Sequence, residues 1–144
     1  MNYKVNWMAI VACVIACMGI GFLWYGALFQ APWMAGNGIT MTDDHSKMLK
    51  NGVEIPMSAT PMILNTVAMI VYALLINWLI NKSNANNLVS GATIGFIIGL
   101  ISCIQVFIGN LFAANSNTLS MVDGSYALVV FTVIGAILGA WQKK

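Results

Sequence analysis

The stretch "LVSGATIGFIIGLISCIQVFIGNLF", residues 88–112, contains no charged side chain and has a glycine at every fourth position from Gly91 to Gly99. About 20 apolar residues in a helix cross the roughly 30 Å hydrocarbon core of a bilayer, so the stretch predicts a membrane-spanning helix. Glycines let helix backbones approach closely in lipid, where no hydrophobic force draws helices together. We therefore predict that its glycine face, continued by Ser102, packs against another helix. The last apolar run has small residues at the same spacing: Gly135, Ala136, Gly139 and Ala140.

The rest of the chain has the composition of a polytopic membrane protein. Of its 144 residues, 60% are hydrophobic and 7% are charged, whereas roughly a quarter are charged in a soluble domain. It contains no arginine and no basic patch, so nucleic acid is excluded as a partner and membrane lipids are expected. The apolar run from Val5 to Tyr25 spans about 30 Å as a helix, which favours a retained span over a cleaved signal peptide.

Four spans are predicted within a single transmembrane domain, residues 1–144, at about residues 6–28, 61–80, 88–112 and 122–141. The predicted fold is an all-α integral membrane four-helix bundle. The outer loop, residues 29–60, is expected to contain a short amphipathic helix in "GITMTDDHSKMLKNG". There Thr40 would cap the start, Asp43 would complete a capping box, and Gly52 would end the helix. Short similarities, "YGALF" with "IGNLF" and "YALLI" with "YALVV", leave open whether the helix pairs are a repeat.

Lysines and aromatic residues predict an orientation with both termini in the cytoplasm. With four spans, both termini and the second connection lie on one side, where no acid accompanies the lysines, while Lys47 and Lys50 lie opposite beside three acids. Tryptophan and tyrosine favour both membrane interfaces. The lysines of the inner side are Lys4, Lys82, Lys143 and Lys144; the aromatic residues are Trp7, Trp78 and Trp141 at the inner ends, and Trp24, Tyr25, Trp33 and Tyr126 at the outer ends.

Catalysis and metal binding find little support. The chain has one histidine and four acids, and it lacks the usual zinc, serine-nucleophile and phosphate-loop motifs, so we expect no enzyme activity and no cofactor. Cys13 and Cys17, one helical turn apart, are too distant for a disulfide on a regular helix and are expected to pack, as is Cys103. On a helix, Met41, His45 and Met48 would share a face suited to Cu(I), although methionine replacing leucine on an apolar face explains them as well.

The polar residues of the spans fall in the predicted outer half of the bilayer. Buried polar groups in hydrocarbon need partners, and an ionisable group there is a candidate for function. One hypothesis is a ligand-binding cleft open to the outer side, with Asp123 as its only fixed charge. The alternative is that Asp123 caps the fourth helix while the amides join helices. The candidate site consists of Trp24, Tyr25, Trp33, Asn65, Gln105, Asn110, Asp123 and Tyr126.

Both ends of the chain resemble a family. The stretches "VNWMAI", "GFLWYGALFQAPWM", "GITMTDD" and "DGSYALVVFTVIGAILGAW" resemble, in that order, the domain of unknown function 1761 family. The resemblance implies a small bacterial membrane protein with about four spans, and it implies no activity. The family pattern often has proline where Ala27 stands and glycine where Gln30 stands. Without that proline, we expect the first helix to continue through Leu28.

The expected function is binding or permeation of a small molecule or lipid through the outer cleft, in the bacterial inner membrane. The alternative is a structural or accessory subunit that docks another membrane protein through glycine and aromatic faces. Four spans leave little room for an internal pathway, so a homo-oligomer is expected in either case.

Overall fold

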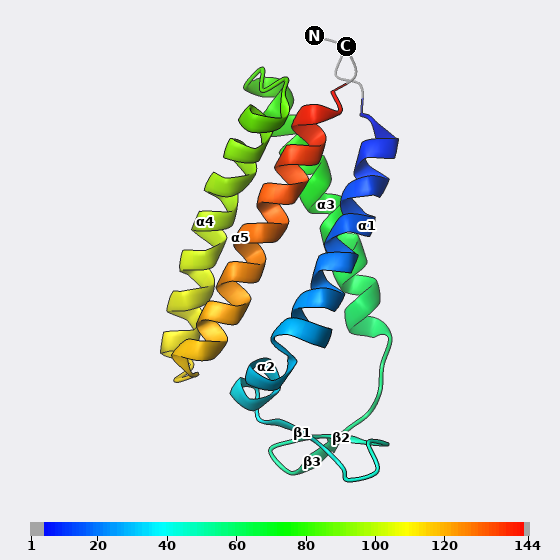
Figure 1. The fold of residues 1–144 in the computed structure, drawn as a ribbon, viewed down its shortest axis with the longest axis vertical. Helices are drawn as coiled ribbons and strands as arrows, with labels where there is room; N and C mark the ends of the chain where they lie inside the picture. Colours follow the sequence, from blue (N-terminus) through cyan, green and yellow to red (C-terminus); the bar gives the residue numbers. More distant parts are fainter. Residues whose placement is uncertain (1–4, 143–144) are drawn as a thin grey trace.

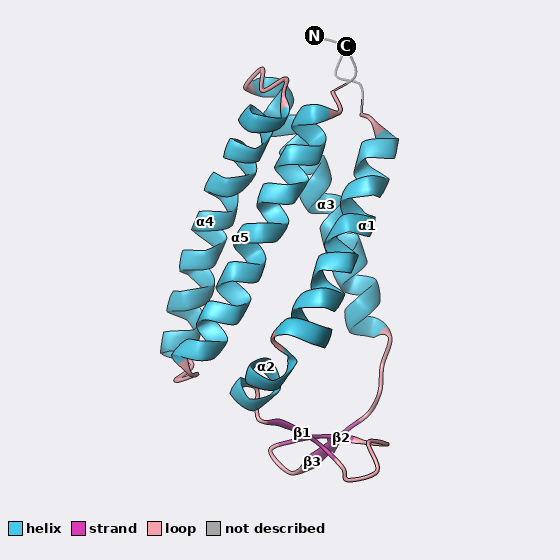
Figure 2. Cartoon of the chain, in the orientation of Figure 1, coloured by secondary structure: helices cyan, strands magenta, loops and turns pink. Residues whose placement is uncertain are grey.

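The computed structural model describes residues 5–142 and consists mainly of four long helices (Figure 1). Each is long and apolar enough to cross a membrane, which confirms the predicted all-α membrane bundle. The start of the first long helix and the end of the last one lie at one end of the bundle, the terminal end, and a small sheet lies at the other, the sheet end (Figure 2). The helices are α1 (Trp7–Leu23), continued by the π-helix η1 (Trp24–Leu28), α3 (Thr60–Lys82), α4 (Leu88–Phe112) and α5 (Asn117–Ala140).

Polar caps set the starts of three helices. Asn6 accepts a hydrogen bond from the Ala9 amide, and Asn87 forms a capping box with Ser90. Ser116 caps α5 by accepting from the Leu119 amide, so α5 begins at Asn117 rather than at the predicted residue 122. The predicted boundary followed the apolar run and missed the polar first turn that serine starts.

The tightest packing in the bundle joins α4 to α5 through the predicted glycine face. Gly91, Gly95 and Gly99 are buried. A Cβ added at Gly91 would lie 2.7 Å from the Gly139 Cα, and one at Gly99 would lie 2.9 Å from the Leu128 Cα. The glycine face is therefore a contact within the chain, with backbone against backbone.

The remaining core lies between α1, α3 and α5 toward the terminal end. Cys13 and Cys17 are fully buried free thiols, as expected for packing residues. They pack with apolar side chains from the neighbouring helices, including Ile76, Ile80, Ile134 and Leu138. Close packing here leaves α4 at the edge of the bundle, in contact mainly with α5 (Figure 1).

The outer segment corrects one prediction, because residues 40–52 form strands and not a helix. The sheet contains β1 (Ile39–Met41), β2 (Met48–Lys50) and β3 (Val53–Ile55), all antiparallel in the order β1-β2-β3. Its second turn is Asn51-Gly52, with both residues at positive φ, which is a strong hairpin signal. The short helix of this segment is α2 (Gln30–Gly36), nearer to the first span.

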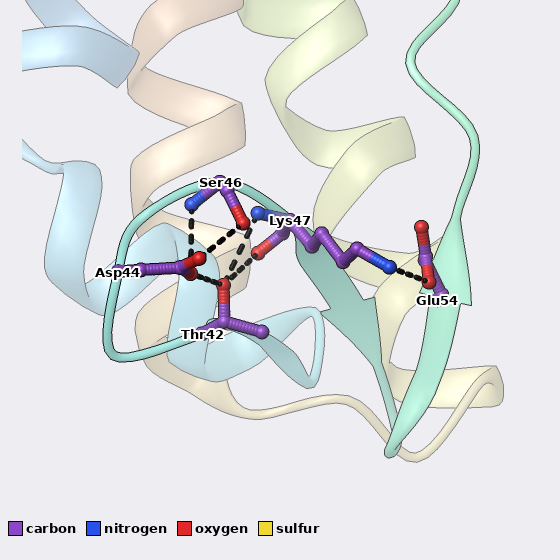
Figure 3. Close-up of polar contacts among 5 residues, drawn as sticks. All are labelled: Thr42, Asp44, Ser46, Lys47 and Glu54. Carbon is purple, nitrogen blue, oxygen red and sulfur yellow. Dashed lines mark hydrogen bonds and ion pairs between the residues drawn. The ribbon is translucent and has the colours of Figure 1, made fainter.

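Local hydrogen bonds explain why the first turn of the sheet is stable without a helix (Figure 3). The Asp44 carboxylate accepts from the Thr42 hydroxyl at 2.6 Å and from the Ser46 amide and hydroxyl at 3.1 Å and 2.7 Å. Aspartate side chains that accept from nearby amides favour turns over helix. Lys47, the residue before β2, then pairs with Glu54 of β3 at 2.9 Å, and both side chains are about half exposed.

Candidate functional site

A change of helix type at the sheet end positions the aromatic residues of the first span. The helix runs through Leu28, as predicted, but its last turn is the wider π form, closed by the Phe29 amide donating to the Trp24 carbonyl at 2.8 Å. Phe29 then leaves helical geometry, and α2 starts in a new direction. This bend brings the rings of Tyr25 and Trp33 to a centroid distance of 5.4 Å. Single π-helical turns in α-helices occur often at functional sites.

Asp123 lies opposite this bend on α5 and is hydrogen-bonded to it. The Tyr25 hydroxyl donates to Asp123 Oδ1 at 3.0 Å, linking η1 to α5. Asp123 is six residues into α5, about 9 Å along the helix axis. Because Ser116 holds the capping position, the alternative in which Asp123 caps the helix is wrong. Apart from Lys82 at the end of α3, Asp123 is the only charged residue in the four spans.

Further aromatic contacts complete the Tyr25–Asp123 cluster, which we define as Trp24, Tyr25, Trp33, Asp123 and Tyr126. The rings of Tyr25 and Tyr126 lie 4.9 Å apart between centroids. The Trp24 indole donates to the Val122 carbonyl at 3.1 Å. The Tyr126 hydroxyl lies over Gly21, where an added Cβ would come within 3.2 Å of it. The cluster thus connects the end of the first span, α2 and α5.

The polar atoms of the cluster without a hydrogen-bond partner among residues 5–142 include Asp123 Oδ2 and the Tyr126 hydroxyl oxygen. Within those same residues, no fully buried side-chain nitrogen or oxygen lacks a partner. Both atoms are therefore open to the surroundings of the protein. In a membrane, a polar group at this depth requires a partner, which leaves room for a polar group from outside the chain.

Three of the eight predicted site residues lie apart from this cluster. Asn65 is exposed on α3, and Gln105 is exposed on α4. Asn110 accepts from the Asn115 side chain at 2.9 Å and so closes the end of α4. Within the described chain, no hydrogen bond or ring contact joins any of the three to the cluster. The sequence predicted that all eight residues lie in the outer half of the bilayer. That depth does not determine which face of its helix each residue occupies.

Sequence reasoning missed a second group of amides, at the terminal end. The Asn6 side chain donates to the Trp141 carbonyl at 2.9 Å, joining the start of α1 to the end of α5. Gln142 donates to the Leu138 carbonyl at 2.7 Å and lies 3.4 Å from the oxygen of Asn77, which is buried on α3. The sequence contained one signal of this group, because Asn77 is a polar residue among the apolar residues of the second span. These amides join three helices.

The methionine and histidine spacing does not form a helical face. Met41 lies in β1 and is the cross-strand partner of Met48 in β2, while His45 lies in the turn between them. The prediction of one helical face with three soft ligands is therefore wrong, because the segment is a hairpin. No group of three or more histidine, cysteine, aspartate or glutamate residues is placed to hold a metal ion anywhere in residues 5–142.

Comparison with known proteins supports the resemblance seen in the sequence. A family model described as "Protein of unknown function (DUF1761)" matches residues 8–139. The chain belongs to this family. The match covers nearly the whole chain, including every residue of the Tyr25–Asp123 cluster. No curated protein and no solved structure matches. Membership in DUF1761 therefore assigns no activity, and the membrane architecture rests on the four long apolar helices.

Proposed function

We propose that this protein binds a small molecule or lipid headgroup bearing an ammonium group at the Tyr25–Asp123 cluster. One observation carries the proposal. Asp123 is the only acid within the four spans; one of its oxygens is held by Tyr25, while the other has no partner in the described chain. A carboxylate fixed in this way is a natural partner for a cation that enters from the membrane interface.

The aromatic residues around Asp123 support a cationic ligand. Tyr25, which holds the carboxylate, contacts Trp33 on α2 and Tyr126 on α5. Aromatic rings attract cations over their faces, and recognition of ammonium groups by aromatic side chains is a common use of this attraction. The Tyr126 hydroxyl supplies a further polar contact, because it too has no partner among the described residues.

The packing of the bundle supports binding more than permeation. Toward the terminal end, the space between α1, α3 and α5 is filled by buried apolar side chains, among them Cys13, Ile80 and Ile134. These groups offer a charged solute nothing to replace its water shell. Catalysis is not part of the proposal, since within residues 5–142 no hydrogen bond joins His45, the single histidine, to Asp123.

We place the sheet end outside the cytoplasm and both termini inside, in the inner membrane of a bacterium. Lys82 lies at the terminal end of α3, whereas Lys47 pairs with Glu54 at the sheet end. Lys4, Lys143 and Lys144, which also support this orientation, lie outside the described residues. Fusing a reporter that is active only in the periplasm to the C-terminus should give no signal, whereas one inserted between Gly52 and Val53 should give signal.

The rival function, docking of another membrane protein, loses part of its basis. It relied on glycine and aromatic faces, and Gly91, Gly95 and Gly99 of α4 pack against α5 inside the chain. The rings of the cluster likewise contact one another. We therefore favour ligand binding.

The test uses the full chain in vesicles with equal amounts of phosphatidylethanolamine, which has an ammonium group, and phosphatidylglycerol, which has none. After gentle extraction, native mass spectrometry identifies the retained lipid. We expect retention of phosphatidylethanolamine and about tenfold less with Asp123→Asn, which keeps an oxygen able to accept from Tyr25. Asp43→Asn, in the outer loop, is the matched control. Equal retention of both lipids, or no effect of Asp123→Asn, contradicts the proposal.

A further inference from the structure

The half of α4 nearest the sheet end carries an amide that faces away from the bundle. The Cys103 sulfur faces α5, since a Cβ added at Gly124 would lie 2.9 Å from it. Gln105 is two residues further, a rotation of about 200° on a helix, and therefore points to the opposite side. It is exposed and forms no hydrogen bond with any described residue.

The depth of Gln105 makes this arrangement costly for an isolated chain. Gln105 lies seven residues before Phe112, the last residue of α4, which is about 10 Å along the axis. With its 25 residues, α4 is about 37 Å long, against a hydrocarbon core of roughly 30 Å, so this position lies about 6 Å inside the core. A primary amide needs a partner there. Glutamine is also too short to reach the interface from there, unlike lysine or arginine.

A glycine lies one turn from Gln105 on the same face. A Cβ added at Gly109 would meet nothing within 4 Å, in contrast to Gly91, Gly95 and Gly99, which face the α5 backbone. Around Gly109 is a shallow groove of about 530 Å³. Its lining is Ile101, Ile104, Gln105, Ile108, Gly109 and Phe112, which we name the outer face of α4. Small residues beside a polar side chain are typical of helix contacts in membranes.

We propose that a second copy of this chain binds to the outer face of α4, with α4 against α4. Copies in one membrane share an orientation, so a two-fold axis along the membrane normal brings identical residues together at identical depth. A primary amide has both a donor and an acceptor, so two Gln105 side chains satisfy each other across that axis. Gly109 on each copy lets the backbones approach closely. This interface is independent of the Tyr25–Asp123 cluster.

The chain provides matched controls for both residues. Asn65 is another exposed amide, on α3, and no glycine lies within one turn of it. Gly19 is another glycine whose added Cβ would meet nothing within 4 Å, and its neighbours one turn away on α1 are apolar. Neither position combines an amide with an open glycine. Replacing them therefore changes polarity or bulk equally without touching the proposed interface.

The experiment measures association of the full chain in vesicles of phosphatidylethanolamine and phosphatidylglycerol. Donor-labelled and acceptor-labelled copies are mixed, and energy transfer is recorded as protein is diluted with lipid. We expect a dimer for the wild type. For Gln105→Leu and for Gly109→Leu, the protein-to-lipid ratio at which half of the dimers dissociate should rise about tenfold. Asn65→Leu and Gly19→Leu should leave it unchanged.

Three results overturn the proposal. The first is energy transfer in the wild type no greater than that of randomly mixed monomers at every density. The second is a wild-type dimer that Gln105→Leu and Gly109→Leu leave intact. The third is equal weakening by Asn65→Leu and Gln105→Leu, which shows that any amide in the spans has this effect. Circular dichroism of each variant confirms that helix content is unchanged, as expected for substitutions on the exposed surface.

Discussion

Gly95→Ala tests the backbone contact between α4 and α5 with a single methyl group. The added Cβ would clash with the Phe131 carbonyl oxygen, and it would lie 2.9 Å from the Phe131 carbonyl carbon and 3.0 Å from the Thr132 Cα. Carbon atoms in contact prefer about 3.5 to 4.0 Å, so the helices must separate by roughly 0.5 to 1 Å. The opposing atoms belong to the backbone of α5 and cannot rotate away.

The energetic cost follows from this separation. A gap of 0.5 to 1 Å forfeits roughly a quarter to a half of each contact energy along the interface. Overpacking of a well-filled interior costs about 1–3 kcal/mol, and we expect a loss of about 2 kcal/mol in the free energy of unfolding. Gly99→Ala should act in the same way, and the double variant should cost less than the sum, because the helices separate only once.

The assay is reversible unfolding of the full chain in mixed micelles, with sodium dodecyl sulfate as denaturant and helix content as the readout. Gly19→Ala is the control, since its methyl group meets nothing within 4 Å. Alanine favours helix over glycine by up to about 1 kcal/mol, and this effect is common to both variants. Equal stability of Gly95→Ala and Gly19→Ala would refute the proposed backbone contact.

Three further predictions concern other contacts. Tyr25→Phe removes the hydrogen bond to Asp123, as does Asp123→Ala, and a double-mutant cycle of the two in the same unfolding assay should give a coupling of about 1 kcal/mol; independent effects would contradict the contact. Asn6→Ala removes both the cap of α1 and the bond to the Trp141 carbonyl, and should cost about 1–2 kcal/mol, whereas Asn86→Ala, in an exposed turn, should cost little. Hydrogen bonds from Thr42 and Ser46 lower the pKa of Asp44 to about 2. These hydrogen bonds therefore stabilise the turn fully above about pH 4, and that stabilisation is lost as the pH falls through about 2. The Ser46 amide resonance should follow that change, and Asp44→Asn should abolish it.

Hydropathy was sufficient to predict the spans, because only long apolar helices satisfy their own backbone in lipid. The glycine spacing also predicted the face of α4 that packs, but not its partner. Several helices could have offered small residues, and the choice of α5 depends on the detailed fit of Gly135 and Gly139 against Gly91.

The outer segment was predicted wrongly because two signals competed. A capping pattern at Thr40 and Asp43 favoured a helix, while Asn51-Gly52 favoured a hairpin turn. The hairpin prevails because Asp44 accepts hydrogen bonds within its own turn, which competes with helix formation.

The candidate site was predicted in part. Tyr25, Trp33, Asp123 and Tyr126 come together because η1 and α2 bend over the start of α5, and this bend has no clear signal in the sequence. Gln105 shares their depth but lies on the opposite side of its helix. Contacts between helices depend on rotation about each axis, which hydropathy does not determine when every face is apolar.

The most direct test of the Tyr25–Asp123 cluster compares choline with 3,3-dimethylbutan-1-ol, which has the same shape without the charge. Nuclear magnetic resonance of the full chain in lipid nanodiscs follows the indole N–H signals during each titration. We predict that choline shifts the Trp24 and Trp33 signals, that the neutral alcohol does not, and that Asp123→Asn abolishes the response. Equal shifts from both compounds, or none from choline, would contradict a cation site.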